Sequence, residues 1–221
     1  QNRNDAKLIG IFRRTSYPSS PKPDQVILTW ANDPTTSQTI QWRTDDTVDK
    51  GQIQWVKKAD FNRFRPAPPK IMDAFTFEMS NTNYVNDPMT HRHTANLTGL
   101  EPDTTYLYYV GQGSDENWSE LSEFTTAPAK TEPFSFVYMG DAQNGFQRWR
   151  SMITGAFRKR PDAAFYIMAG DLVDRGNDID DWDNMLHHAR DVYNQRTLIP
   201  AIGNHEIQGG QPTTYLQLFD L

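Results

Sequence analysis

The chain has 221 residues, with 22 Lys and Arg residues against 28 Asp and Glu residues, and it contains no Cys. This length suits one large or two modest domains, and the net charge of −6 disfavours nucleic acid as a structural partner. The lack of Cys excludes disulfides, Cys-ligated zinc and a cysteine nucleophile. The longest apolar runs, 26–30 and 165–169, fall far short of the ~20 residues of a membrane-spanning helix, so no membrane span is predicted.

The first half of the chain has the pattern of an all-β domain. Residues 1–23 form a lead-in segment that ends in a proline-punctuated stretch. Ile40 and Trp42 lie two residues apart, which places both on one face of a strand. Seven short strands separated by turn residues predict a β-sandwich over 24–128, and the loop 65–70 holds too many prolines for a central strand. The predicted strands are 25–30, 38–43, 51–57, 74–79, 91–98, 104–111 and 121–126.

One run within this domain carries a family resemblance. Leu100-Glu-Pro102-Asp-Thr104-Thr-Tyr106 resembles the tyrosine-corner signature of the fibronectin type III family. Trp30 ends an early strand, where that family keeps a core Trp. The resemblance implies a fibronectin type III-like sandwich in which Trp30 and Tyr106 are core aromatics and do not bind a ligand.

The hydrophobic period changes after residues 127–130. Apolar runs predict strands at 134–139, 163–169 and 198–202, of which the first two are buried strands. Helical spacing predicts helices at 146–159 and 178–195, and the second begins with an acidic turn that offsets its dipole. The alternating β-α-β-α-β order predicts a parallel sheet with right-handed crossovers over 133–221.

Each of these three strands ends in a glycine followed by polar residues. The ends read Gly-Asp-Ala-Gln at 140–143, Gly-Asp-Leu-Val-Asp-Arg-Gly at 170–176 and Gly-Asn-His-Glu at 203–206. Because ligands of open α/β sheets bind beyond the carboxyl ends of the strands, these side chains are expected at one rim. Carboxylate and amide oxygens, supplemented by a His nitrogen, suit divalent metals and iron.

The three motifs, at spacings of 30 and 33 residues, resemble the calcineurin-like metallophosphoesterase superfamily. With a fibronectin-like domain in front, the chain resembles the purple acid phosphatase architecture. Residues 133–221 would then be the first βαβαβ half of a metallophosphoesterase α/β sandwich. The resemblance implies a metal-dependent phosphoric ester hydrolase, similar to an acid phosphatase acting on monoesters, that takes a small phosphorylated substrate. Its two metal ions, Fe, Zn or Mn, would supply a metal-bound hydroxide.

The resemblance also implies roles for individual rim residues. Asp141 would bind the first metal, Asp171 would bridge both, and Asn204 would bind the second. His205 would contact the phosphate or protonate the leaving oxygen, and Asp174 would set its charge state.

Three positions depart from one or another branch of the family. Arg175 resembles the phosphate-contacting Arg of the Ser/Thr phosphatase variant, with a solvated loop charge as the alternative. Gln143 stands where many non-purple relatives have His, and it is either a metal ligand through its amide oxygen or a hydrogen-bonding group behind the ligands. Asp174 stands where purple enzymes carry Tyr, so bound iron would lack the tyrosinate colour.

Later motifs of the family do not occur in these residues. An isolated His and a G-H-x-H are missing, and His91, His93, His187 and His188 are not expected to replace them. We therefore expect the 221-residue chain alone to be inactive and to be part of a longer enzyme, exported to the periplasm or the exterior after removal of a signal. The alternative is a non-catalytic β-sandwich, serving as a binding or spacer module, attached to a degenerate or truncated metallophosphoesterase domain.

Overall fold

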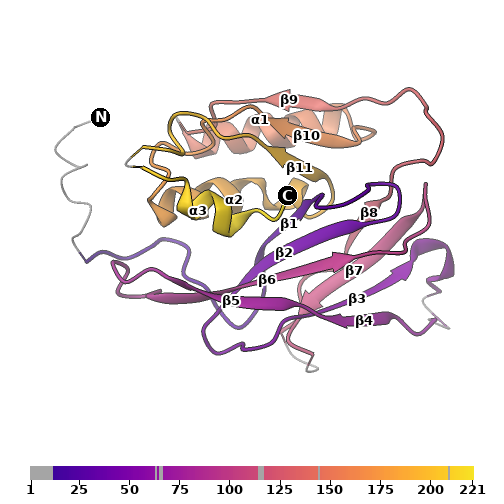
Figure 1. Cartoon of the computed structure of the whole chain (residues 1–221), viewed down its shortest axis with the longest axis horizontal. Coiled ribbons are helices and arrows are strands. Elements are labelled where there is room, and N and C mark those ends of the chain that lie inside the picture. The colour runs from indigo at the N-terminus through magenta and orange to yellow at the C-terminus, as the bar shows by residue number, and fades with distance from the viewer. Residues whose placement is uncertain (1–11, 63, 65–66, 114–116, 144, 209) are drawn as a thin grey trace.

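The structure, a computed structural model, describes residues 12–62, 64, 67–113, 117–143, 145–208 and 210–221. A β-sandwich forms one layer and an α/β region lies against it (Figure 1). A short 3-10 helix, Lys58–Asp60, follows the third strand of the sandwich. The strands of the sandwich are β1 (Asp24–Thr29), β2 (Gln38–Asp45), β3 (Gln52–Lys57), β4 (Lys70–Asp73), β5 (Phe75–Ser80), β6 (Met89–Leu97), β7 (Thr105–Gly111) and β8 (Ser122–Thr125).

The sandwich consists of two antiparallel sheets, in the orders β1-β2-β6-β5 and β4-β3-β7-β8. Fully buried side chains such as Trp42, Ile53 and Tyr108 fill the space between them. All seven predicted strands are present, which confirms the sandwich. The eighth, β4, follows the proline-rich loop and pairs only with β3 within the described residues. An edge position is where a strand next to prolines is tolerated.

The two aromatic residues that suggested a fibronectin-like core have different surroundings. Tyr106 is buried, stacks on Phe124 at 5.4 Å and accepts a hydrogen bond from the Glu101 amide at 2.9 Å, as a tyrosine corner does. Trp30 is half-buried and packs edge-to-face on Phe165 of the α/β region at 5.6 Å. The prediction that Trp30 is a core residue of the sandwich is therefore wrong, because its ring covers the junction with the next domain.

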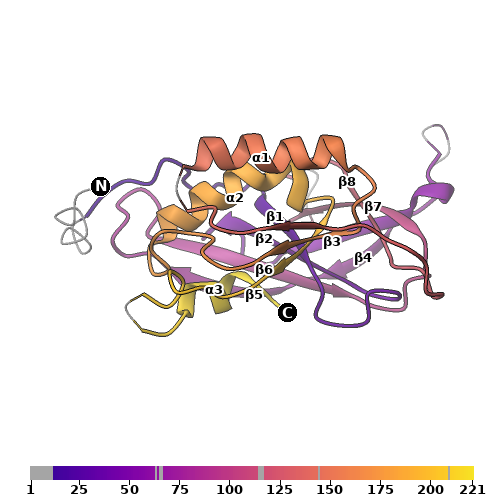
Figure 2. The same cartoon turned by 90° about the horizontal axis from the view of Figure 1, so that it is seen from above.

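The α/β region contains a three-stranded parallel sheet in the order β11-β10-β9, which confirms the predicted topology. Helices α1 and α2 lie on one face of this sheet (Figure 2). The short helix α3 was not predicted. The elements are β9 (Val137–Met139), α1 (Phe146–Lys159), β10 (Phe165–Met168), α2 (Ile179–Tyr193), β11 (Thr197–Pro200) and α3 (Thr213–Leu218).

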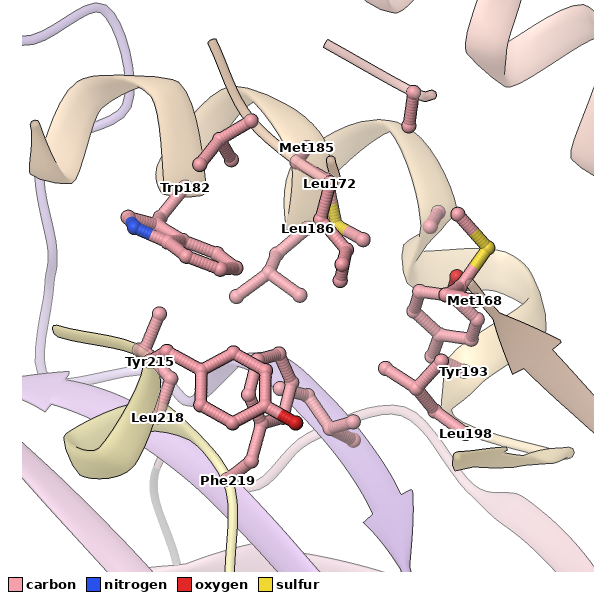
Figure 3. Close-up of a cluster of buried hydrophobic side chains, with 14 of the residues drawn as sticks. Met168, Leu172, Trp182, Met185, Leu186, Tyr193, Leu198, Tyr215, Leu218 and Phe219 are labelled. Carbon is pink, nitrogen blue, oxygen red and sulfur yellow. The ribbon is translucent and has the colours of Figure 1, made fainter. Parts of the chain in front are cut away.

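A second hydrophobic core fills the α/β region. Trp182 and Leu186 of α2 face Tyr215 and Phe219 at the α3 end of the chain (Figure 3). The rings of Trp182 and Phe219 are 5.8 Å apart. This packing fixes α2 and α3 around the loops that leave the sheet. Within the described residues, no helix has the length and apolar composition needed to cross a membrane.

Strand β9 is buried on one face only. Val137 and Met139 pack against the core, whereas Phe134, Phe136 and Tyr138 are 68%, 48% and 68% exposed. The continuous apolar run 134–139 predicted a strand buried on both faces. This expectation is wrong for the face that carries Phe134, Phe136 and Tyr138. The ladder of β9 starts only at Val137, and β10 is its partner.

A buried polar network joins the two domains. Arg43 of β2, only 3% exposed, donates to Asp24 at 2.6 Å and to Asp183 of α2 at 3.0 Å. Gln25 donates to the same Asp183 carboxylate at 2.7 Å. Burial alone would lower the pKa of Arg43, but the carboxylates of Asp24 and Asp183 outweigh it and raise that pKa. The guanidinium therefore stays charged, and removing one partner would leave an uncompensated buried charge.

His93 lies in the sandwich core, away from the α/β region. It is fully buried and stacks on Trp42 at 5.3 Å. Its Nε2 lies 2.8 Å from the Thr44 hydroxyl, and its Nδ1 lies 2.8 Å from the Thr76 hydroxyl. Burial, together with the nearby charge of Arg92, lowers the pKa of His93 to about 3. The imidazole is consequently neutral in the folded protein at all ordinary pH values.

This burial predicts a loss of stability in mild acid. Between pH 6.5 and 4.5 the unfolded chain binds a proton at residue 93 and the folded protein does not, so the free energy of unfolding falls as the pH falls. The drop should be about 2 kcal/mol larger for the wild type than for His93→Gln, whose amide can still bond both hydroxyls. Urea unfolding at the two pH values measures this, and equal drops would contradict it.

Candidate active site

The three strand-end motifs lie together at one edge of the parallel sheet. They begin within three residues of the ends of β9, β10 and β11, and hydrogen bonds donated by backbone amides connect them. The Asp141 amide donates to the Gly170 carbonyl at 3.3 Å, and the His205 amide donates to Asp171 Oδ1 at 3.1 Å. The structure therefore brings Asp141, Asp171 and the Asn204–His205 pair to one rim.

Both expected aspartate ligands occupy the left-handed backbone region. The φ angle is 54° at Asp141 and 53° at Asp171. This conformation is uncommon for residues other than glycine, and such strain costs of order 1–3 kcal/mol per residue. Its recurrence at equivalent points of two motifs indicates that the surrounding structure holds the backbone of both residues in a set conformation.

The glycines of the motifs leave room for the loops to pack against each other. A Cβ atom on Gly203 would lie 2.2 Å from Asp171 Oδ1, and one on Gly170 would lie 2.8 Å from the Gly203 Cα atom. Gly170 also has a φ of 85°. Any larger residue at 203 would push the Asp171 carboxylate away, so this glycine is part of the positioning of the rim.

Glu206 organises the rim, and its role was missed in the sequence. The side chain is fully buried, and its carboxylate accepts four backbone hydrogen bonds. Oε1 accepts from Leu172 at 2.8 Å and Val173 at 3.3 Å, and Oε2 accepts from Asp171 at 2.9 Å and Gly203 at 2.7 Å. Glu206 thus clamps the loop after β10 to the loop after β11. The only signal was an acidic residue at the end of the third motif, and three of its four partners lie more than 30 positions away.

His205 is held by the loop that contains Asp174. Its Nδ1 lies 2.8 Å from the Asp174 carbonyl oxygen, 3.5 Å from the Asp174 carboxylate and 2.9 Å from Gln208 Nε2. A proton on Nδ1 satisfies the carbonyl, and the contacts of the described residues leave Nε2 uncommitted. Asp174 therefore contacts His205 through Nδ1, and its effect on the charge state of His205 stays a prediction.

Arg175 is engaged by acidic side chains at the start of α2. Its Nε and Nη2 donate to Asp181 at 2.9 and 2.7 Å, and Nη2 is 2.9 Å from Asp178 Oδ2. The hydrogen bond to Asp181 is the main cause that raises the pKa of Arg175. The guanidinium is ion-paired and its side chain is 31% exposed, so it is partly solvated. Its contact with phosphate stays a prediction, and among the described residues only Nη1 is left uncommitted for it.

Gln143 supplies an acceptor that fits a metal ion. The side chain is 8% exposed, and its Oε1 has no hydrogen-bond donor among the described residues. An unsatisfied buried acceptor costs about 1–3 kcal/mol, which a bound cation would relieve. Oxygen donors from Asp141, Asp171, Asn204 and Gln143 form a set that hard divalent cations prefer.

The rim is nevertheless poor in imidazole and carboxylate. In the described part of the chain, no three His, Asp or Glu side chains lie close enough together to hold a metal ion. His187 stacks on Tyr17 at 4.0 Å, and His188 Nδ1 lies 2.7 Å from the Asn184 carbonyl. The histidines of α2 thus have other partners, and the donor set of the rim consists of two carboxylates and two amides.

Comparison with known proteins assigns both halves of the chain. The model of the purple acid phosphatase N-terminal domain matches residues 23–126, and that of the calcineurin-like phosphoesterases matches residues 134–220. Uncharacterised proteins from two strains of Mycobacterium tuberculosis are each 28% identical over 205 residues, covering 83% of this chain. The chain spans 36% of the length of these curated relatives.

Solved structures share the fold at low sequence identity. Purple acid phosphatase PPD1 from yellow lupin (Lupinus luteus) seeds has a TM-score of 0.73 and 17% identity, over 91% of this chain and 41% of its own. PhoD has a TM-score of 0.52 and 13% identity, over 93% of this chain and 44% of its own. The likeness to the lupin enzyme extends over both domains, so the order of the two domains is shared as well.

The clamp formed by Glu206 generates a prediction about stability. In Glu206→Gln, one of the two carboxylate oxygens becomes an NH2 group that faces backbone N–H groups, so two hydrogen bonds are lost and donors are opposed. We expect the free energy of unfolding of the α/β region to fall by about 2–3 kcal/mol. Denaturant unfolding measures this, with the exposed Glu132→Gln as control, which should change stability by about 0.5 kcal/mol or less. A Glu206→Gln variant as stable as the control would refute the clamp.

Proposed function

The chain carries a purple acid phosphatase N-terminal domain followed by a calcineurin-like phosphoesterase region, and on this premise we propose that it hydrolyses phosphoric esters with two metal ions bound at the rim. The observation that carries the proposal is the rim itself. Asp141 and Asp171 are held in strained backbone at the ends of adjacent strands, and the buried Gln143 Oε1 lacks a donor.

The metal ions would be held by Asp141, Asp171, Asn204 and Gln143, with Asp171 between the two. When bound, such ions supply positive charge to the phosphoryl oxygens and an activated water molecule. The chain fixes where this occurs, because the Asp171 carboxylate is oriented by the His205 amide and the Asp171 backbone by Glu206.

His205 would act on the leaving group. With Nδ1 bonded to the Asp174 carbonyl, Nε2 is the nitrogen that can carry a proton towards the ester oxygen. As the P–O bond breaks, Nε2 would transfer this proton and the alcohol would leave neutral. The Asp174 carboxylate lies 3.5 Å from Nδ1 of this ring. Arg175 would contribute Nη1 to a phosphoryl oxygen, while Asp181 holds the rest of its guanidinium.

Several finer features belong to the same proposal. Resemblance to purple acid phosphatases favours monoesters of small molecules over diesters. Fe, Zn or Mn would serve as the metals, and Asp174 in place of Tyr predicts no tyrosinate colour with iron. We also place the protein outside the cytoplasm, which fractionation of producing cells would test.

The non-catalytic alternative keeps one observation in its favour. No three His, Asp or Glu side chains within the described residues are arranged around a metal position. In this alternative the β-sandwich would be the functional module, for binding or spacing, and the rim would have lost its catalytic function. Under either explanation, the 221-residue chain by itself is expected to bind metal weakly and to hydrolyse substrate negligibly. The natural protein distinguishes them: it should be active if the chain only lacks further ligands, and inactive if the function has been lost.

The bridging role proposed for Asp171 can be tested with a single isosteric change. Asp171→Asn keeps an oxygen for the His205 amide but removes the charge, so the fold should persist while bound metal is lost. Hydrolysis of 4-nitrophenyl phosphate by the natural protein should fall by about 100-fold or more, since charge stabilisation by metal is worth several kcal/mol. Metal content, turnover and thermal unfolding are measured together, with the exposed Asp49→Asn as control.

Two results would count against the proposal. One is a wild-type protein without metal or turnover at several pH values in the presence of added Zn, Mn or Fe. The other is an Asp171→Asn variant that retains both. Unfolding of the variant would instead make Asp171 a structural residue.

A further inference from the structure

A cavity of about 500 Å³ lies between the two domains, and residues of the rim loops form part of its lining. One wall consists of Arg175, Asn177 and Gln208 from the loops after β10 and β11, and the opposite wall is the segment 79–84 of the β-sandwich. We propose that this cavity receives the alcohol part of the phosphoester, so that the β-sandwich forms one wall of the substrate site. This inference rests on the proposed function.

Arg175 and Gln208 connect this cavity to the proposed phosphate position and to His205. The leaving oxygen must lie next to His205 if that residue protonates it. Gln208, which lines the cavity, is 2.9 Å from His205 Nδ1, and Arg175, the proposed phosphate contact, lines it as well. The Gly176 amide also bonds to the His205 carbonyl at 3.1 Å. The cavity therefore begins one side chain away from the His205 ring, and it is lined by Arg175, the proposed phosphate contact.

The lining indicates which alcohols would bind. Its volume lies within the roughly 300–1,000 Å³ of small-molecule sites. Groups that hydrogen-bond hydroxyls favour a polar alcohol over an aryl or alkyl one, because an apolar group would leave them unpaired. We therefore assign the cavity to polyhydroxylated alcohols, such as sugars. The neutral polar lining residues are Ser80, Asn81, Thr82, Asn83, Asn177, Gln208, Thr214 and Gln217.

Contacts across the domain boundary hold the two walls at a set separation. Tyr84 of the β-sandwich donates to Asp178 Oδ1 at 2.5 Å, and Arg13 pairs with both residues. Asp178 Oδ2 in turn lies 2.9 Å from Arg175 Nη2. A wall tied to the reacting side in this way is preorganised, which lowers the entropic cost of binding.

The larger cavity of the molecule does not compete for this role. It measures about 890 Å³ and is lined by Trp30, Phe134, Phe165 and Thr197, among others. Phe165 and Thr197 are the first residues of β10 and β11, at the end of the sheet opposite to the rim. None of the strand-end residues described above lines it.

Blocking the sandwich wall tests the inference. Thr82 lines the cavity and is exposed, so Thr82→Trp should fill the cavity without disturbing a hydrophobic core. Thr98→Trp is the matched control, because Thr98 is exposed and lines none of the cavities described here. The natural protein is assayed with Mn²⁺ and two probes: glucose 6-phosphate, whose Michaelis constant is measured, and inorganic phosphate, whose inhibition constant is measured. Thr82→Trp should raise the constant for glucose 6-phosphate about fivefold or more and leave that for inorganic phosphate within about twofold.

The other outcomes overturn the inference. If Thr82→Trp affects neither probe, or weakens both equally, the cavity does not hold the alcohol, although the phosphate site stands. If the wild type binds phenyl phosphate as tightly as glucose 6-phosphate, the selection for polar alcohols is wrong. If the wild type binds neither glucose 6-phosphate nor inorganic phosphate, the proposed function fails and this inference fails with it.

Discussion

The carboxylate of Asp178, almost fully buried, joins the start of α2 and the neighbouring rim loop to the β-sandwich, which is far away in the chain. It caps the start of α2 by accepting from the Asp180 amide at 3.2 Å, and it accepts from Tyr84 of the β-sandwich at 2.5 Å. Burial raises the pKa of this carboxyl, but hydrogen bonds from Arg13 and Tyr84 outweigh that and lower it, so the group stays ionised. As an anion it also faces Arg175 in the rim loop. The start of α2, the docking of the sandwich and the direction of Arg175 consequently depend on one charge.

Local pattern was enough to predict the sandwich, the parallel sheet and the rim, because strand periodicity and strand-end position need no knowledge of distant contacts. Where prediction failed, the partner was either distant in the chain or brought close only by the fold of a loop. Trp30 packs on Phe165, and Glu206 binds amides of the loop after β10. The pairing of Arg175 with Asp181 spans only six residues, but it depends on how the loop folds onto α2. Chain separation hides the first two, and loop conformation hides the third.

The contacts between the domains weigh against a sandwich that merely spaces other parts. A passive module would meet its neighbour through a small or solvated surface. Here Arg43 is buried against Asp183 of α2, and Tyr108 of β7 donates to the Asn194 carbonyl at 2.7 Å. Such buried polar partners lose their compensation if the domains separate. These contacts therefore couple the sandwich to the α/β region, so a substitution that breaks them in one domain should also destabilise the other.

Glu206 gives the rim a thermodynamic character of its own. Four amides from two loops share one carboxylate, so a motion that withdraws this side chain releases all four at once. The two loops therefore cannot open one after the other, and intermediate states in which half of the rim is intact are disfavoured. Local opening of this kind has its own free energy, which can be smaller than that of global unfolding. The edge of the sheet would then exist in two states, assembled or open, while the sandwich and the helices beneath it remain folded.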